Sequence, residues 1–294
     1  MNRFSIKDIE NLTGIKAHTI RIWEQRYGIL QPKRTPTNIR FYDADDLKLA
    51  LRVALLNNYG YKISRIHKMS PDEMNSLINK VADKDFRVQA LVNQLLEATL
   101  AVDVDLFEGL IDQYIRKNGF ERTVEELLFL FLEKIGLMWM TDRIFPAQEH
   151  LVSNVIYRKI AVAIEQLPPK PADATPKVLL FLPEGEIHDL ALLYVHYLMR
   201  KSGKDAIYLG PNSPVREVRF VYEACAPKYL YLHLTSIAEE FDGNRYLQRL
   251  GQEFPEARLL VSGGMLRSRK YTQPANATFL YSLQEVREVV TSLS

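Results

Sequence analysis

The alternation of apolar, strand-like segments with helix-like segments after Lys177 is the feature that most constrains the fold. Strands are expected at 177–183, 205–209, 228–235, 257–262 and 277–282, with helices at 188–202, 213–225, 238–253 and the C-terminus. This alternation predicts a parallel sheet with helices on both faces. Five strands suit a flavodoxin-like or Rossmann-like order, in which ligands bind beside the first strand at the carboxyl edge of the sheet.

A histidine follows the first expected strand, in the segment Glu186-Ile-His188-Asp-Leu-Ala191. We expect it where the next helix begins. A neutral imidazole at this edge can ligate a metal, and Glu186 or Asp189 can orient the ring through its other nitrogen. The alternative is a solvated histidine at a helix start.

The middle of the chain, from about residue 85 to residue 167, has apolar residues at helical spacing. Breaks at Asp103, Asp105 and Gly119, and a last helix from about Pro146, predict an antiparallel four-helix bundle. The proline-rich stretch at 166–176 predicts a linker. Trp139 and the pair Glu149-His150 stand out here, although they could be surface residues at the rim of the bundle.

The first third of the chain has the pattern of a winged helix-turn-helix. Ser5 is well suited to cap a first helix, Gly14 interrupts it, and a second helix over 17–26 buries Ile20 and Trp23. A proline-punctuated turn over 32–42 predicts a hairpin wing, and a helix follows the carboxylates of residues 43–46. The residues expected to contact DNA are Lys16, His18, Thr19, Arg21, Arg34, Asn38, Arg40 and Tyr42.

Charge is distributed unevenly along the 294 residues. Residues 1–80 carry 14 Lys and Arg against 8 Asp and Glu, whereas the whole chain has a formal net charge of only +2. A basic head on a mildly acidic body is typical of a nucleic-acid-binding sensor, although a solvated basic face gives the same count.

Composition excludes several classes of protein. The 47% hydrophobic and 25% charged residues are those of a globular chain, and the longest apolar runs are too short to span a bilayer. The N-terminus does not have the pattern of a signal peptide, so we expect a cytoplasmic protein without membrane association. Cys225, the single cysteine, excludes an internal disulfide and a site of several thiolates.

Two sets of motifs resemble known families. The sequence Thr19-Ile-Arg-Ile-Trp23-Glu-Gln-Arg-Tyr-Gly28, followed by Arg40-Phe-Tyr42, closely resembles the MerR winged helix-turn-helix. Lys16 stands where many relatives have a serine N-cap. Trp139, Glu149-His150, Glu186-x-His188 and Gly263-Gly264 resemble the cobalamin-binding module, a four-helix bundle followed by a Rossmann-like domain.

The second resemblance implies a cofactor and the residues that bind it. In that module His188 would ligate cobalt from below, oriented by Glu186, while Trp139 and Glu149 would face an upper adenosyl group. His150 would be an alternate cobalt ligand, and Gly263 and Gly264 would admit the nucleotide tail. This chain departs from the family at Ala191, where glycine is usual, and in the Ser-x-Leu motif, for which His233 or Thr235-Ser236 is the best match.

Together the two resemblances imply a transcription regulator rather than an enzyme. The expected domains are a DNA-binding head at 1–75, a bundle at 83–167 and a cobalamin-binding domain at 177–294. Adenosylcobalamin, with light as a signal in one branch of the family, would control binding of a dimer or tetramer to a palindromic operator. The alternatives are a regulator that has lost cobalamin and uses its C-terminal domains for protein contacts, and a corrinoid carrier for a methyltransferase.

Overall fold

The computed structural model describes residues 2–169, 176–235 and 241–293. The chain divides into two compact units, Met1–Val155 and Ile156–Ser294. This boundary falls inside a helix, ahead of the proline-rich stretch predicted as a linker, of which residues 170–175 lie outside the described residues. The three domain boundaries expected from the sequence therefore stay predictions.

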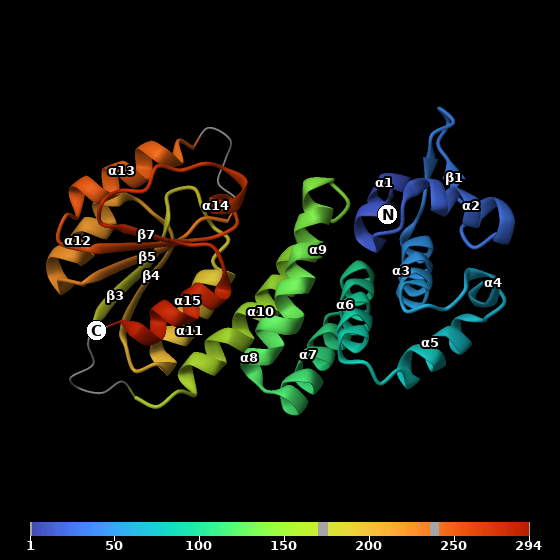
Figure 1. Cartoon of the computed structure of the whole chain (residues 1–294), viewed down its shortest axis with the longest axis horizontal. Helices are drawn as coiled ribbons and strands as arrows, with labels where there is room; N and C mark the ends of the chain where they lie inside the picture. The colour runs from blue at the N-terminus through green and yellow to red at the C-terminus, as the bar shows by residue number, and fades with distance from the viewer. Residues whose placement is uncertain (1, 170–175, 236–240, 294) are drawn as a thin grey trace. The chain divides into compact units, whose positions relative to one another are not determined.

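The beginning of the first unit is a helix-turn-helix with a short wing (Figure 1). A capping box at Ser5 begins the first helix, and Gly14, at a φ of 76°, ends it, as the sequence predicts. Asp43 caps the helix after the wing through the N–H groups of Asp45 and Asp46. The elements are α1 (Ile6–Thr13), α2 (Ala17–Tyr27), β1 (Lys33–Arg34), β2 (Arg40–Phe41), α3 (Ala44–Asn58), α4 (Ile63–Ile66) and α5 (Pro71–Lys80).

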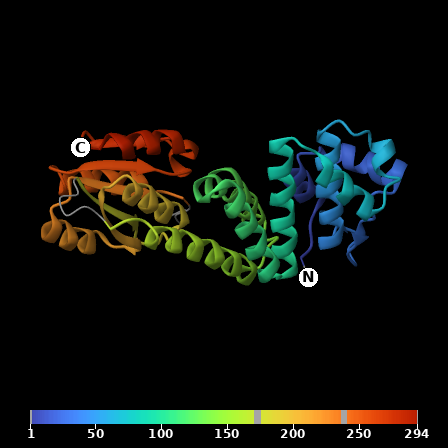
Figure 2. The same ribbon diagram turned by 90° about the horizontal axis from the view of Figure 1, so that it is seen from below.

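Further helical segments complete the first unit. They are α6 (Lys84–Ala101), α7 (Val104–Asn118), α8 (Phe120–Arg122), the π-helical turn η1 (Thr123–Leu128), α9 (Phe129–Met140) and α10 (Pro146–Glu165), which crosses into the second unit. Because α8, η1 and α9 follow one another without a break, they form the third of the four helices that the sequence predicts. Figure 2 shows α6, in teal, alongside α3. The Arg52–Glu97 ion pair joins these two helices at 2.6 Å.

The second unit contains a five-stranded parallel sheet in the order β4-β3-β5-β6-β7. Counted within this unit, the order is 2-1-3-4-5, which confirms the flavodoxin-like expectation. The strands are β3 (Lys177–Pro183), β4 (Asp205–Ser213), β5 (Tyr229–His233), β6 (Arg258–Ser262) and β7 (Ala277–Leu280). The helices are α11 (Leu190–Lys201), α12 (Val215–Cys225), α13 (Gly243–Glu253), α14 (Met265–Ser268) and α15 (Leu283–Ser292).

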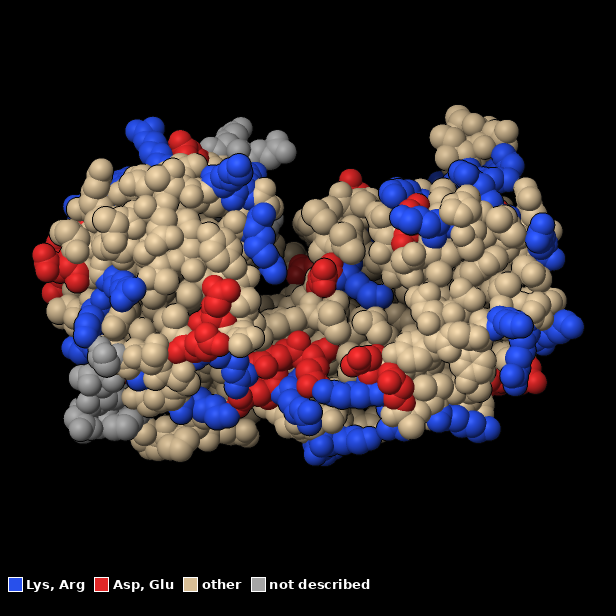
Figure 3. All heavy atoms as spheres, viewed as in Figure 1, with Lys and Arg blue, Asp and Glu red and all other residues tan. Residues whose placement is uncertain are grey.

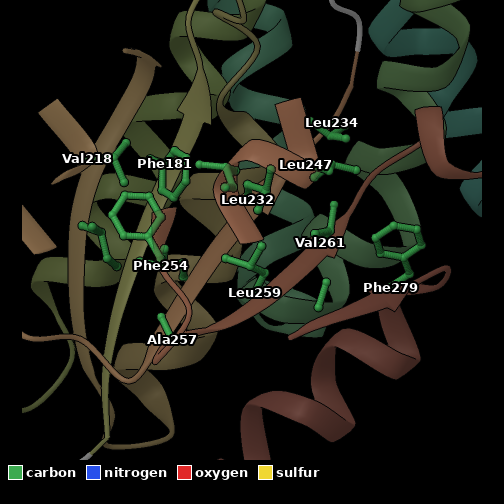
Figure 4. Close-up of a cluster of buried hydrophobic side chains, with 14 of the residues drawn as sticks. Phe181, Val218, Leu232, Leu234, Leu247, Phe254, Ala257, Leu259, Val261 and Phe279 are labelled. Carbon is green, nitrogen blue, oxygen red and sulfur yellow. The ribbon is translucent and has the colours of Figure 1, made fainter. Parts of the chain in front are cut away.

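Helices cover both faces of this sheet. Figure 1 shows α12 and α13 on one face and α11 and α15 on the other. On the first face, Phe181, Leu232 and Val261 of adjacent strands pack against Leu247 of α13 and against Phe254, which follows that helix (Figure 4). The other face receives the alternate residues of each strand, as the two-residue period of a strand requires.

Several element boundaries differ from the prediction. The helix expected from residue 188 begins at Leu190, the second strand of the sheet continues to Ser213, and α14 was not predicted. The helix expected over 238–253 begins at Gly243, and residues 238–240 lie outside the described residues. Of these differences, the first matters most, because it places His188 in a loop.

Candidate functional site

One face of α2 is available to DNA. His18 and Arg21 are exposed and Thr19 is half-buried, whereas Ile20 and Trp23, 1% and 6% exposed, turn into the core. Lys16, whose side chain is 72% exposed, is the N-cap residue but makes no side-chain cap. The structure thus leaves the predicted second-helix residues accessible, as a recognition helix requires.

A carboxylate from α1 supplies a hydrogen-bond acceptor at the N-terminus of α2, where Lys16 makes no side-chain cap. Glu10 accepts a hydrogen bond from the Ala17 N–H at 3.4 Å and another from Lys16 Nζ at 3.4 Å. Partial desolvation opposes ionisation of Glu10, but Lys16 and Lys7 outweigh it and lower the pKa of its carboxyl group. Because the acceptor lies in another helix, reading the sequence for a local cap at residue 16 missed it.

The wing carries the remaining predicted cations. Arg34 Nη1 donates to the side-chain oxygen of Asn38 at 2.7 Å and to its backbone oxygen at 3.2 Å. Asn38 has a φ of 66°, so it shapes the turn and also holds Arg34. Arg40 is exposed on β2, and Figure 3 shows Lys and Arg side chains around the base of the wing. This arrangement suits phosphate contacts.

The prediction that Tyr42 contacts DNA is wrong. Its side chain is 0% exposed, and its hydroxyl group donates a hydrogen bond to the Glu24 carboxylate. Burial and the hydrogen bond to Glu24 raise the pKa of Tyr42. Its backbone also pairs with Phe4 through two hydrogen bonds of 2.8 Å. Tyr42 is therefore a core residue that ties the end of the wing to α2 and the N-terminal segment.

In the helical part of the first unit, Glu149 and His150 are paired and Trp139 is accessible. The Glu149 Oε2 to His150 Nδ1 distance is 2.7 Å, and Ser153 Oγ donates a hydrogen bond to the other oxygen of Glu149. The side chain of His150 is 64% exposed. Trp139, 44% exposed, lies in the last turn of α9, ahead of the loop that leads to α10. An exposed indole near the C-terminal end of a helix is a suitable surface for a flat ligand.

In the second unit, Glu186 fixes the orientation of His188. Glu186 is 0% exposed, and its Oε1 accepts the His188 backbone N–H at 2.9 Å. The same oxygen lies 2.7 Å from Nδ1 of the His188 ring, whose side chain is 50% exposed. With the ring hydrogen on Nδ1, a metal would bind at Nε2, which is the usual arrangement of an oriented histidine ligand. Both residues lie in the loop after β3, at the expected edge of the sheet.

His233, which the sequence left without a role, lies at the end of the neighbouring strand β5. Its Nδ1 is 2.8 Å from Ser262 Oγ, which in turn lies 2.5 Å from the hydroxyl of Tyr231. Burial lowers the pKa of His233 to about 4 although the charge of Glu186 opposes this, so the ring is neutral at pH 7. Of the other candidate for this motif, Thr235-Ser236, the serine lies outside the described residues.

The two glycines after β6 differ in their surroundings. A Cβ on Gly263 would lie 2.2 Å from the carbonyl oxygen of Leu234, and its φ of 117° is one that side chains rarely allow. A Cβ on Gly264 would meet nothing within 4 Å. Gly263 is therefore required by the packing of backbone on backbone, and only Gly264 faces open space.

The donor set suits a metal that carries its own ligands. Among the residues that the structure describes, no group of three or more His, Cys, Asp or Glu is placed to hold a metal ion. A single oriented imidazole, as at His188, fits a metal already held in a macrocycle.

None of the described helices has the length and apolar character needed to span a membrane.

Comparison with known proteins identifies two family matches within the chain. Residues 4–73 match the MerR HTH family regulatory protein, and residues 91–164 match the B12 binding domain. The chain is 28% identical to the HTH-type transcriptional repressor CarH of Myxococcus xanthus over 89% of this chain and 88% of CarH. It is 27% identical to CarA of the same organism, over 71% of this chain and 68% of CarA.

A solved structure has the same fold over much of the chain. The monomethylamine corrinoid protein of Methanosarcina barkeri superposes with a TM-score of 0.52 at 16% identity, over 69% of this chain and 98% of its own. Both sequence relatives are transcriptional repressors, in agreement with the prediction of a regulator. A MerR-type head and a B12-binding domain were both predicted from the sequence, and both are confirmed.

Proposed function

Because the chain is a MerR-type helix-turn-helix regulator that carries a B12-binding domain, we propose that cobalamin controls its binding to DNA. The observation that carries the proposal is the buried Glu186 carboxylate, which holds the half-exposed ring of His188 at 2.7 Å. Burying a carboxylate is costly unless it is hydrogen-bonded, and here its partner is an imidazole at the carboxyl edge of a parallel sheet. An ordinary surface histidine needs no such partner.

We propose roles in cofactor binding for the residues that the sequence predicted. When bound, cobalamin would supply a cobalt centre, and we propose that His188 would ligate it. Trp139 and Glu149 would contact an adenosyl group of the cofactor, and His150 would be an alternate cobalt ligand. The 44% exposure of Trp139 and the Glu149–His150 pair support these roles. Gly264 rather than Gly263 is the position beside which a nucleotide tail has room.

The partner is double-stranded DNA. We propose repression, as in the two relatives, from a palindromic operator that a dimer or tetramer occupies in the cytoplasm. Adenosylcobalamin would stabilise the assembled form because a ligand that binds one arrangement better shifts the population toward it. Basic residues on α2 and the wing support DNA as the partner.

The test is cofactor retention followed by DNA binding. Wild type, His188→Ala and Glu186→Gln are mixed with adenosylcobalamin in the dark, desalted and examined by visible spectroscopy. We expect wild type to keep the corrinoid, His188→Ala to lose the spectrum of histidine-ligated cobalt, and Glu186→Gln to bind more weakly, since loss of an outer-shell partner typically costs about 10–100-fold in affinity. Lys48→Ala, which breaks an ion pair with Asp45 in the DNA-binding head, changes no residue proposed to bind the cofactor and serves as a control.

Each outcome separates the alternatives. If wild type retains no corrinoid, the alternative of a regulator that has lost cobalamin is correct. If it retains corrinoid but binds no duplex from a random pool, the corrinoid carrier is favoured. Illumination of the loaded protein before a gel-shift assay then tests the light response, and we expect release of DNA.

A further inference from the structure

The exposed face of α2 contains two residues that are not among the predicted DNA contacts. Arg21 and Ile22 follow His18 by three and four positions, and Gln25 follows them by four and three, so the four residues form one stripe along the helix. All four are exposed, and Ile22 is 42% exposed. The stripe lies opposite the buried face that carries Ile20 and Trp23. If α2 enters a major groove, this stripe meets the base edges.

Ile22 is not suited to contact the DNA backbone. It offers no hydrogen-bond donor to a phosphate, unlike Arg21 beside it in the chain. The major-groove edge of a base pair has one apolar group, the C5-methyl of thymine. An aliphatic side chain in the middle of an otherwise polar stripe therefore complements thymine and no other base.

Gln25 lies one turn farther along the same stripe. A glutamine amide can donate to N7 and accept from the N6 amino group of adenine, so it complements adenine in the major groove. The two side chains, at positions i and i+3, point the same way along the helix. Both therefore favour A·T pairs.

We propose that Ile22 and Gln25 read A·T pairs in each half-site, with Ile22 in contact with the methyl group of a thymine. The inference rests on the proposed function, since it requires that α2 lie in the major groove. It goes further because it assigns base preference to two particular side chains. His18 and Arg21 remain candidates for the flanking phosphates and bases.

The experiment uses the loaded full-length protein and a random duplex pool. We expect the selected sequences to be enriched in thymine at one position of each half-site. That thymine is then replaced by deoxyuridine, which lacks only the methyl group. Wild-type affinity should fall about fourfold per half-site, the value for removing one methyl-sized apolar contact. Ile22→Ala should bind the two duplexes equally, and Gln25→Ala should lose its preference for adenine at one position.

A matched control is available in the wing. Ile39 is 64% exposed but does not lie on α2, so Ile39→Ala should keep the full difference between thymine and deoxyuridine. Thermal unfolding followed by tryptophan fluorescence checks that the variants fold. No enrichment of thymine, or an equal loss with deoxyuridine in wild type and Ile22→Ala, overturns the inference while DNA binding stands. Absence of any duplex binding by wild type overturns the proposed function as well.

Discussion

An ion pair joins the DNA-binding head to the loop between α9 and α10, and its removal should destabilise the first unit measurably. Asp8 of α1 is 5% exposed, and its Oδ2 accepts hydrogen bonds from the Ser5 N–H and from Arg143 Nε, each at 2.6 Å. Lys134 Nζ also donates to the backbone oxygen of Leu12 at 3.2 Å. Arg143→Ala would leave the Asp8 carboxylate in place with one of its two donors removed.

The expected loss of unfolding free energy follows from this geometry. Removing one partner of a fully buried ion pair costs about 3–5 kcal/mol. Arg143 is 32% exposed and the Ser5 N–H remains, so water and one donor compensate part of the loss. We therefore expect about 1–3 kcal/mol, the cost of a buried polar group left partly unsatisfied.

Urea unfolding measures this energy, and the two tryptophans of the chain, Trp23 in the head and Trp139 on α9, report on both sides of the contact. A double-mutant cycle of Arg143→Ala with Asp8→Asn isolates the pair, and we expect a coupling energy of at least about 0.5 kcal/mol. As a control, Lys48→Ala breaks an exposed i,i+3 pair with Asp45 and should cost less than about 0.5 kcal/mol. If the losses of unfolding free energy caused by Arg143→Ala and Asp8→Asn are additive, the two side chains do not stabilise each other and the expected coupling is refuted.

Three further predictions concern DNA binding and pH. Arg40→Ala should weaken binding to every duplex and reduce the salt slope by about one, and an unchanged slope would exclude a phosphate contact. Tyr42→Phe should lower the melting temperature through loss of a hydrogen bond worth about 1.5–3 kcal/mol but leave that slope unchanged, and a changed slope would return Tyr42 to the interface. Burial, with the nearby charge of Arg200, lowers the pKa of His196 to about 4 from an unfolded value of 6.5. Only the unfolded chain binds this proton between these values, so urea titrations should show stability of the second unit falling as pH drops from 6.5 to 4. Because burial also lowers the pKa of His233 to about 4, His196→Phe, which keeps a ring beside Tyr208, should reduce that fall without abolishing it, and an equally steep fall would rule out a contribution from His196.

Local signals in the sequence were sufficient for much of the fold. Ser5 and Gly14 delimit α1 through contacts within a few residues, and the strand order follows from the alternation of strands and helices. Residues that depend on distant partners were not predictable in this way. Tyr42 differs from an exposed wing aromatic only because Glu24 accepts its hydroxyl and Phe4 pairs with its backbone.

In the candidate cofactor site too, local features were predictable from the sequence and contacts with distant residues were not. The motif around His188 predicted its location at the sheet edge and Glu186 as its partner, and the structure has both. The motif could not distinguish Gly263 from Gly264, because the difference arises from Leu234, a residue of the neighbouring loop. It also could not reveal that His233 shares Ser262 with Tyr231, since this network connects two strands.

The close packing of Gly263 against Leu234 restricts the backbone at this edge of the sheet. Leu234 donates its N–H to the Ser262 oxygen at 2.8 Å and accepts the Met265 N–H at 3.2 Å, so the segments after β5 and β6 are linked on both sides of the glycine. We expect these amides to exchange slowly with deuterium and the backbone here to keep its shape when a ligand arrives. A new ligand preference at this edge would then evolve by exchanging side chains such as His233, and a loop insertion next to Gly263 would not be tolerated.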